Sequence, residues 1–245
     1  VAAAAAPPAM VVTFLDVGQG DAIVVRGPTG RTLLVDAGGE VEGYLTGYDV
    51  GARRVVPALR RLGVRYVDVI ILTHPHEDHA GGLPAVAQNF PVGLLLDSGT
   101  PHPAPSYVRL LRLVESRRIP YRLARRGMRL DLGGGAGGTI LNPPEPPFLG
   151  SSADVNLNSV VLRLVYGTTS VLLTGDIEGL AEIGLLDNGP GLRSTILKVA
   201  HHGSATSSTP AFLAAVAPAA AVISVGALNP FGHPHRRTLD ALHAA

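Results

Sequence analysis

The sequence contains no cysteine, and this absence limits both how the chain is held together and what it can bind. Disulfide bonds and thiolate metal ligands are excluded, so a metal site would have to use histidines and carboxylates. Tryptophan is also absent and aromatic residues make up only 4% of the chain, whereas 46% is hydrophobic. The core must therefore consist mainly of Val, Leu, Ile and Ala. Because the formal net charge is only +1, bulk electrostatics do not indicate a nucleic-acid partner.

The chain also lacks an apolar run long enough to cross a bilayer and the basic opening segment of a signal peptide. Residues 1–10 begin with an alanine-rich stretch that runs into two prolines, and we interpret them as a linker or the remnant of a cut. We expect residues 11–245 to form one domain. Such a chain would fit a piece excised from a longer protein.

Hydrophobic patterning predicts an α/β fold. The predicted strands are 11–16, 22–26, 32–35, 67–72, 92–96, 159–166, 170–174, 197–200 and 221–225. Helices are predicted at 57–63, 107–116 and 210–216, and the glycine run 133–138 and the proline-rich 143–147 are predicted loops. Strands are predicted early and late in the chain with helices between them, and the two halves have a similar order of elements. This pattern favours a four-layer αββα sandwich.

Polar clusters follow four of these strands at their carboxyl ends. Asp36 and His74 follow two early strands, and Asp176 and His201 follow two late ones. Ligands of open α/β sheets bind outside the carboxyl ends of the strands. We therefore expect these side chains to converge on one edge of the fold.

The motif His74-Pro75-His76-Glu77-Asp78-His79 carries the strongest chemical signal in the chain. Imidazole nitrogens and carboxylate oxygens are the ligands that a divalent ion such as Zn²⁺ takes. Alternation would let an extended loop aim His74, His76 and Asp78 in one direction, while His79 reaches a second ion. Two ions about 3.5–4 Å apart would stabilise both the attacking and the leaving oxygen of a displacement. A polar turn that holds histidines by chance is the weaker alternative.

Two further aspartates are candidates. Asp176 is predicted to bridge the two ions, and the alternative is a helix cap in front of Ile177. Asp36 is predicted to fix a ligand imidazole from behind, although a turn in Asp-Ala-Gly-Gly explains it equally well.

The pair His201-His202 is predicted to provide the last metal ligand. Adjacent residues of a strand point to opposite faces, so we expect only one of the two to bind. Lys198, the only lysine, lies on the same strand. It either holds a phosphate and stabilises a leaving oxyanion or is an ordinary surface lysine. His233 is a candidate for contacting or protonating the scissile group. The other histidines, His102, His235 and His243, are interpreted as surface residues.

An arginine-rich stretch separates the two groups of motifs. Residues 109–129 contain eight arginines and one acid, Glu115. Such a block can follow a phosphate backbone, because the guanidinium group donates to phosphate in a forked geometry. The alternative is a solvated helix face in a chain that uses Arg for all but one of its 20 Lys and Arg residues.

Taken in order, Asp36, the His74–His79 motif, Asp176 and the strand-end histidine resemble the motifs of the metallo-β-lactamase superfamily. More specifically, FLDVGQGDA, LLTGDIE, LKVAHHGS and NPFGHPH resemble the hydrolase-like domain of the ComEC family of DNA-uptake proteins. The resemblance runs from about residue 11 to the end. It implies an extracytoplasmic domain, periplasmic or at the cell surface, that is attached to a membrane channel and degrades the DNA strand that is not taken up.

The resemblance also implies a set of site residues and two divalent ions, Zn²⁺ or Mn²⁺. The implied metal ligands are His74, His76, Asp78, His79, Asp176 and one of His201 and His202. Many superfamily members place a further histidine before the Gly-Asp motif, but residues 154–159 contain none. ComEC-like domains have asparagine there. Asn158 or Asn156 would then serve as a weaker ligand or bind substrate, and Ser159 would lie behind a ligand or meet substrate.

We predict a metal-dependent phosphodiesterase that acts on single-stranded or duplex DNA and uses no nucleotide cofactor. Asp78 would orient the attacking water or take its proton, and Lys198 or His233 would help to offset charge on the leaving oxygen. One alternative is a hydrolase of another ester or a lactone on the same fold. The other is a non-catalytic DNA-binding or gating domain with a vestigial site.

Overall fold

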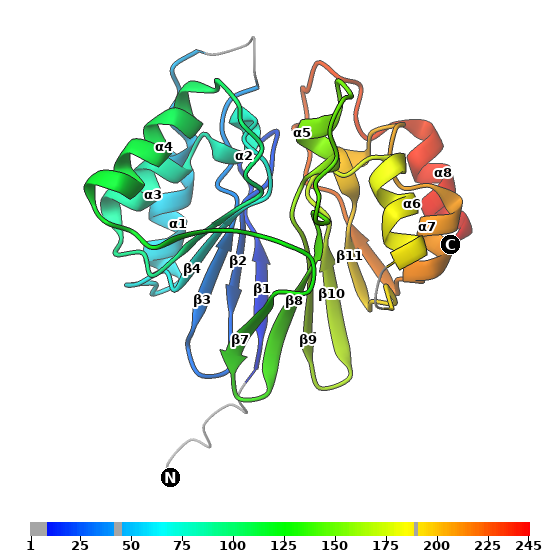
Figure 1. Ribbon diagram of the computed structural model, residues 1–245, viewed down its shortest axis with the longest axis horizontal. Helices are drawn as coiled ribbons and strands as arrows, with labels where there is room; N and C mark the ends of the chain where they lie inside the picture. The colour runs from blue at the N-terminus through cyan, green and yellow to red at the C-terminus, as the bar shows by residue number, and fades with distance from the viewer. Residues whose placement is uncertain (1–8, 42–45, 189–190) are drawn as a thin grey trace.

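Two six-stranded sheets face each other, with helices on the outer face of each (Figure 1). This computed structural model describes residues 9–41, 46–188 and 191–245. Most of the predicted linker, residues 1–8, lies outside the described residues. The first sheet and its helices come from the first half of the chain, and the second sheet and its helices come from the second half.

The strands of the first sheet lie side by side in sequence order. They are β1 (Val11–Phe14), β2 (Ile23–Arg26), β3 (Thr32–Val35), β4 (Val69–Leu72), β5 (Leu95–Asp97) and β6 (Tyr121–Leu123). β1 to β3 pair antiparallel, and β3 to β6 pair in parallel. The helices of this half are η1 (Gly51–Val55), α1 (Val56–Arg61), α2 (Glu77–Ala80), α3 (Leu83–Asn89) and α4 (Pro105–Ser116). α3 and α4 each have a proline in the first turn. Backbone N–H groups there have no hydrogen-bond partner within the helix, so the helix loses no bond by having proline.

The second sheet repeats this plan. Its strands are β7 (Arg129–Gly133), β8 (Ala136–Asn142), β9 (Val161–Tyr166), β10 (Thr169–Leu173), β11 (Ile196–Lys198) and β12 (Ala220–Val222). β7 to β10 pair antiparallel, and β10 to β12 pair in parallel. The helices are α5 (Asp154–Leu157), α6 (Gly179–Asn188), η2 (Ala200–Gly203), α7 (Pro210–Val216) and α8 (Arg236–Ala244). In each half, parallel strands therefore bring their carboxyl ends to one edge of the sheet.

Three apolar layers separate the four layers of backbone. Side chains of a strand alternate between its two faces, so each inner strand feeds two of these layers. In β2, Ile23 packs between the sheets and Val24 packs under the first group of helices. In β10, Leu173 packs between the sheets and Leu172 packs against the second group. The predicted αββα sandwich is thus confirmed.

The glycine-rich segment 133–138 was expected to be a loop, and that prediction is wrong. Gly133, Gly134 and Gly135 have φ values of 78°, 57° and 83° and form the turn between β7 and β8. Gly138 lies within β8, where a Cβ atom would come within 2.9 Å of Leu162 Cδ1. Glycine is used here both for the left-handed turn and for close packing of β8 on β9.

Every predicted strand and helix overlaps an observed one, with ends shifted by a few residues. Several elements were not predicted, among them the short β6, α2 and α5 and the longer α3, β8, α6 and α8. Within the part of the chain that the structure describes, no helix has the length and hydrophobicity needed to span a membrane.

Candidate metal centre

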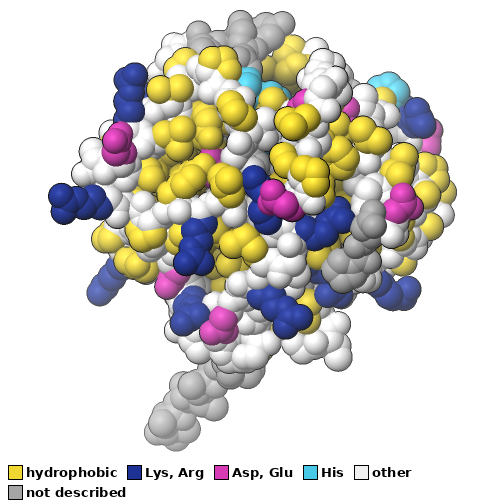
Figure 2. All heavy atoms as spheres, viewed as in Figure 1, with side chains coloured by type: hydrophobic (Ala, Val, Ile, Leu, Met, Phe, Trp, Pro, Cys, Tyr) yellow, Lys and Arg dark blue, Asp and Glu magenta, His cyan; other side chains and the backbone are white. Residues whose placement is uncertain are grey.

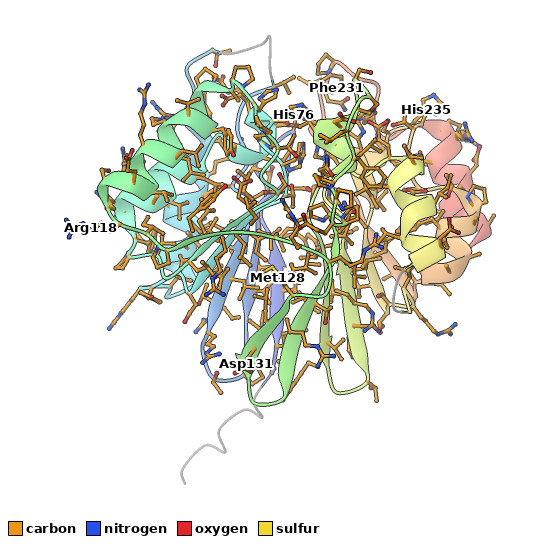
Figure 3. The ribbon with its side chains drawn as sticks, in the orientation of Figure 1. His76, Arg118, Met128, Asp131, Phe231 and His235 are labelled. Carbon is orange, nitrogen blue, oxygen red and sulfur yellow. The ribbon has the colours of Figure 1, made fainter. Side chains whose placement is uncertain are left out.

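The expected convergence of polar side chains occurs at one end of the sandwich, between the two halves. Asp36 directly follows β3, and Asp176 comes shortly after β10. The side chains of His74, His79 and His202 all lie within 3.9 Å of one Asp176 oxygen, Oδ2. Figure 3 shows His76 and Phe231 at this same end, from opposite halves of the molecule.

Four of these side chains form a tight group. His79 Nε2 and His202 Nε2 lie 3.2 Å apart, and they lie 3.3 and 3.2 Å from Asp176 Oδ2. Asp78 Oδ2 completes the group at 3.9 Å from His79 Nε2 and 3.4 Å from His202 Nε2. Ligand atoms about 2.0–2.2 Å from one ion are about 3–4 Å from each other. The separations therefore fit four ligands of a single ion.

Hydrogen bonds behind the two imidazoles fix which nitrogen faces this point. His202 Nδ1 donates to the Ser224 carbonyl oxygen at 2.9 Å, and His79 Nδ1 donates to Asp36 Oδ2 at 2.8 Å. Both Nε2 atoms therefore present lone pairs to each other at 3.2 Å, which is unfavourable unless a cation lies between them. The predicted role of Asp36, behind a ligand imidazole, matches this contact.

The charges of the tight group also favour a cation. Burial alone would lower the pKa of His202, but Asp176 and Asp78 outweigh it and raise the pKa to about 9. Burial would likewise raise the pKa of Asp78, but His79 and His202 hold it at about 2. The acidic side chains of the group therefore favour positive charge at His202.

The motif reaches this geometry differently from the prediction. His74 and His76 lie on the segment after β4, but Asp78 and His79 lie on the short helix α2. The extended alternation expected for positions 74, 76 and 78 is therefore wrong for Asp78. One turn of helix instead carries Asp78 and His79 to the same side of the motif, next to Asp176.

The second group lies on the other side of Asp176. Thr73 Oγ1 donates to Asp36 Oδ2 at 2.6 Å, so it accepts from His74 Nδ1 at 3.0 Å. His74 Nε2 then carries a lone pair, lies 3.9 Å from Asp176 Oδ2, and is buried with no hydrogen-bond partner. The ring of His76 is 4.8 Å from that of His74. An unpaired buried acceptor beside a carboxylate fits a metal ligand.

His201 and His202 do not lie on a strand. β11 ends at Lys198, and the two histidines adopt left-handed φ values of 49° and 53° within η2. Their Nε2 atoms lie 3.9 and 3.2 Å from the same Asp176 oxygen. The expectation that only one of them faces the site is therefore wrong, because this backbone does not alternate sides.

Lys198 is neither a surface residue nor placed to touch a leaving oxygen. Its side chain is fully buried and forms an ion pair with Asp21 Oδ2. Asp21 was missed by the sequence reasoning. It lies 4.0 Å from the Nδ1 atoms of His79 and His202, and Lys198 Nζ also lies 3.9 Å from Asp176 Oδ1, so the ion pair adjoins the tight group. The proposed substrate contact of Lys198 is corrected to a contact that supports the tight group.

The glycine-rich loop before Asp21 was the signal that could have found it. A Cβ atom on Gly20 would come 1.9 Å from the Asp78 carbonyl oxygen, so only glycine allows the loop to reach α2. The Asp21 amide then donates to that same oxygen at 3.3 Å.

Residues 154–159, which lack the expected histidine, hold neighbouring parts of the backbone in place. Asn158 uses both side-chain groups to hold the preceding loop, through the backbone of Phe148 and Asp154. These hydrogen bonds occupy both side-chain groups, so the prediction of Asn158 as a ligand or substrate contact is wrong. Ser159 Oγ accepts from the Asp176 amide at 3.2 Å and so lies directly behind a ligand.

An open cavity of about 250 Å³ leads to the two groups. Its lining is Gln19, Val41, His76, Asp78, Asp176, His201, His202, Phe231 and His233. The rings of Phe231 and His233 are stacked, with centroids 5.5 Å apart, and Phe231 is 51% exposed. Burial, followed by His201 and His202, lowers the pKa of His233 to about 4. His233 is therefore neutral at pH 7 and placed to donate a hydrogen bond, not to deliver a proton.

Two other groups of residues depart from the expectations. The ring of His102, taken as a surface residue, lies 5.2 Å from that of His76. The arginine stretch does not form one surface. Arg117, Arg125 and Arg126 donate to backbone carbonyl oxygens, and Arg118 points away from the site at the far edge of the first half (Figure 3). Basic side chains on the face in Figure 2 are separated by apolar and acidic ones.

Comparison with known proteins decides the family. A model of the metallo-beta-lactamase superfamily matches residues 15–227, which is most of the chain. The chain belongs to this superfamily. Metallo-beta-lactamase superfamily proteins are typically metal-dependent hydrolases, and the buried side chains of Asp21, His79, Asp176 and His202 lie close enough together to hold a metal. Asp21 faces the Nδ1 atoms, whose hydrogen bonds leave Nε2 for a metal, so we take Asp78 as the fourth ligand. The predicted resemblance is confirmed at this level.

Relatives of this chain include a ComE operon protein and a competence protein. ComE operon protein 3 of Bacillus subtilis (strain 168) is 29% identical over 240 residues, which cover 94% of this chain and 30% of that protein. Competence protein ComA of Neisseria gonorrhoeae is 34% identical over 234 residues, which cover 95% of this chain and 29% of that protein. The chain thus spans less than a third of these relatives.

Similarity to solved structures supports the fold alone. The metallo-beta-lactamase fold protein YhfI from Bacillus subtilis matches with a TM-score of 0.56 at 11% identity, covering 94% of this chain and 92% of that one. A CmlA beta-hydroxylase mutant, E377D, also has a TM-score of 0.56, at 18% identity, and covers 96% of this chain and 49% of that one. Proteins of different activity share this fold, so the fold does not decide the substrate.

Proposed function

We propose that this domain is a metal-dependent phosphodiesterase that cleaves DNA. The observation that carries the proposal is the position of Asp176, whose Oδ2 atom is approached by histidine nitrogens of both groups at 3.2–3.9 Å. Both groups border an open cavity with an exposed aromatic ring at its rim. The name of one relative, which refers to competence, favours DNA as the substrate.

The residues fit two divalent ions, for which we propose Zn²⁺ or Mn²⁺. One would be held by Asp78, His79, Asp176 and His202, and the other by His74, His76 and Asp176. When bound, such ions polarise a phosphoryl oxygen and make water a better nucleophile at neutral pH. All the proposed ligand atoms are nitrogen or oxygen, which suits either metal.

The protein's own groups position the reactants. Asp78 lines the cavity and is held ionised, so it can orient a water molecule or accept its proton. His233 lies opposite with a neutral ring and can donate a hydrogen bond to the leaving oxygen. Phe231 offers a face on which a base of single-stranded DNA can stack.

We further propose the setting that the resemblance to the ComEC family implies. In the complete protein the domain would be extracytoplasmic and joined to a membrane channel portion, where it degrades the strand that is not transported during natural transformation. Cells that carry Asp78→Ala in the full-length protein should still bind labelled DNA but release no labelled nucleotides. Continued release would contradict this assignment.

The test of activity uses chemically metal-free protein and labelled single-stranded and duplex DNA, with Zn²⁺, Mn²⁺ and Mg²⁺ re-supplied one at a time. Cleavage restored by a metal should vanish in His76→Ala and Asp78→Ala, whereas Asp78→Ala should still bind DNA. Cleavage that survives in Asp78→Ala would show that the mechanism is wrong. Salt-sensitive DNA binding without cleavage by any metal would instead indicate a gating domain.

One observation favours a second candidate, a hydrolase of a smaller ester or a lactone. Of the described residues that line the cavity, none is Arg or Lys. Such an enzyme needs no polyanion contact, so its activity should depend little on salt. Cleavage of DNA that weakens steeply between 50 and 200 mM salt would exclude it.

A further inference from the structure

We propose that His201 is the third protein ligand of the first metal site and replaces the histidine that residues 154–159 lack. With His74 and His76 alone, that site would have only two imidazoles besides the shared Asp176. His201 comes from η2, in the other half of the molecule. It lines the same cavity as His76 and Asp176.

The distances around Asp176 support this role. His74 Nε2 and His201 Nε2 each lie 3.9 Å from Asp176 Oδ2. Atoms that bind one ion at about 2.0–2.2 Å are about 3.4 Å apart in a tetrahedron and up to about 4.2 Å apart across an octahedron. Both contacts fall in that range, so His201 and His74 stand in equivalent relation to the shared carboxylate.

The backbone explains how two neighbouring histidines serve two sites. In a strand, one ring would turn away from Asp176. Here His201 and His202 both have left-handed φ values, and Gly203 follows with a φ of 84°. This backbone instead directs both rings toward the Asp176 carboxylate. The ring centroids are 6.2 Å apart with planes at 71°, so the two Nε2 atoms approach Asp176 from different directions.

The segment without the histidine supports His201 instead of supplying a ligand. Asn156 Nδ2 donates to Glu178 Oε1 at 2.9 Å. The same Glu178 oxygen lies 3.5 Å from His201 Nδ1, slightly longer than a good hydrogen bond. A carboxylate behind a histidine sets the orientation of the ring and raises its basicity as a ligand. We assign Glu178 as a positioning residue for His201.

Two rival donors lie near the same cavity. His233 Nδ1 and Asn156 Oδ1 are both buried without a hydrogen-bond partner. Among the described residues, His201 differs from both in lying within 4.0 Å of Asp176. The inference concerns metal binding by this chain and holds whether or not DNA is the substrate, so the two proposals can fail separately.

The test is a calorimetric titration of the metal-free protein, residues 1–245, with Zn²⁺ alone and then with Mn²⁺ alone. The wild type should bind two ions per chain. His201→Ala should retain the tight ion and lose the other, or bind it at least about tenfold more weakly. Glu178→Gln should weaken the same ion by a smaller factor. Circular dichroism spectra that match the wild type would establish that the variants are folded.

His233→Ala is the matched control and should bind two ions with wild-type affinities. Asn156→Ala removes the hydrogen bond to Glu178, so it should still bind two ions and weaken the second by no more than Glu178→Gln does. Two ions of unchanged affinity in His201→Ala would overturn the assignment. Loss of an ion in His233→Ala or Asn156→Ala, with His201→Ala intact, would transfer the role to that residue. A wild type that binds one ion, with an affinity that His201→Ala leaves unchanged, would also overturn it.

Discussion

The two ligand groups on either side of Asp176 are built differently. In the tight group, His79 and His202 are buried, and a hydrogen bond behind each ring holds it in place. In the other group, His76 and His201 line the open cavity, and His201 Nδ1 makes no hydrogen bond within the protein. The difference indicates that one site is organised before the metal arrives, while the other includes His201, a ring that no hydrogen bond within the protein fixes.

The largest effect is expected when the residue common to both groups is removed. Asp176→Ala takes a ligand from each site, so both affinities should collapse and turnover should fall by at least about 10³-fold. The measurement is bound metal per chain together with the rate of DNA cleavage. If Asp176→Ala keeps one ion at wild-type affinity, the two groups do not share this carboxylate.

The support behind the tight group should be important for stability. Lys198→Met leaves the Asp21 carboxylate buried without its partner, and the free energy of unfolding should fall by about 3–5 kcal/mol. Urea unfolding of the metal-free protein measures this change. The double variant Lys198→Met/Asp21→Asn should recover part of the loss, because it leaves no buried charge unpaired. Equal destabilisation in both variants would contradict the ion pair.

Weakening one support should separate the two sites. Asp36→Asn removes the carboxylate that contacts His79 directly and His74 only through Thr73, so the affinity of the tight site should fall about 10–100-fold and that of the other site by a smaller factor. Glu178→Gln provides the mirror-image variant for His201. Titration of each variant with Zn²⁺ would resolve the two affinities. An equal loss at both sites in Asp36→Asn would show that the groups are not independent.

The tight site should bind metal more strongly as pH rises. The pKa of metal-free His202 is about 9, so below that pH the ring carries a proton that the metal must displace. Apparent affinity should therefore increase about tenfold per pH unit for each proton released, and level off above about pH 9. Zn²⁺ titrations in buffers of different ionisation enthalpy would count the protons. An affinity that is flat between pH 6 and pH 8 would contradict the raised pKa.

Much of this site could be predicted because residue type and strand position carry the information. The carboxyl ends of buried strands lie on one edge of a sheet, and this placed Asp36, His74 and Asp176 together. Backbone conformation was not visible in the same way. The sequence His-His does not indicate left-handed φ values, so the orientation of His201 could not be predicted.

Burial of charge was the second gap. A lone lysine near a strand end is normally predicted to lie at the surface, because burying an isolated ammonium group is unfavourable. Its partner, Asp21, is distant in sequence and reaches Lys198 only because Gly20 lets a loop approach α2. The glycine run 133–138 was also predicted incorrectly. Its composition suggested a loop, but it contains both a turn and part of a packed strand.

The central claim is that hydrolysis needs both ligand groups filled. The most direct measurement follows DNA cleavage and bound metal in the same samples while Mn²⁺ or Zn²⁺ is added stepwise to metal-free protein. Cleavage should be nearly absent up to one ion per chain, then rise between one and two ions and stop rising at two. Full activity at one ion per chain, or none when two are bound, would contradict the account.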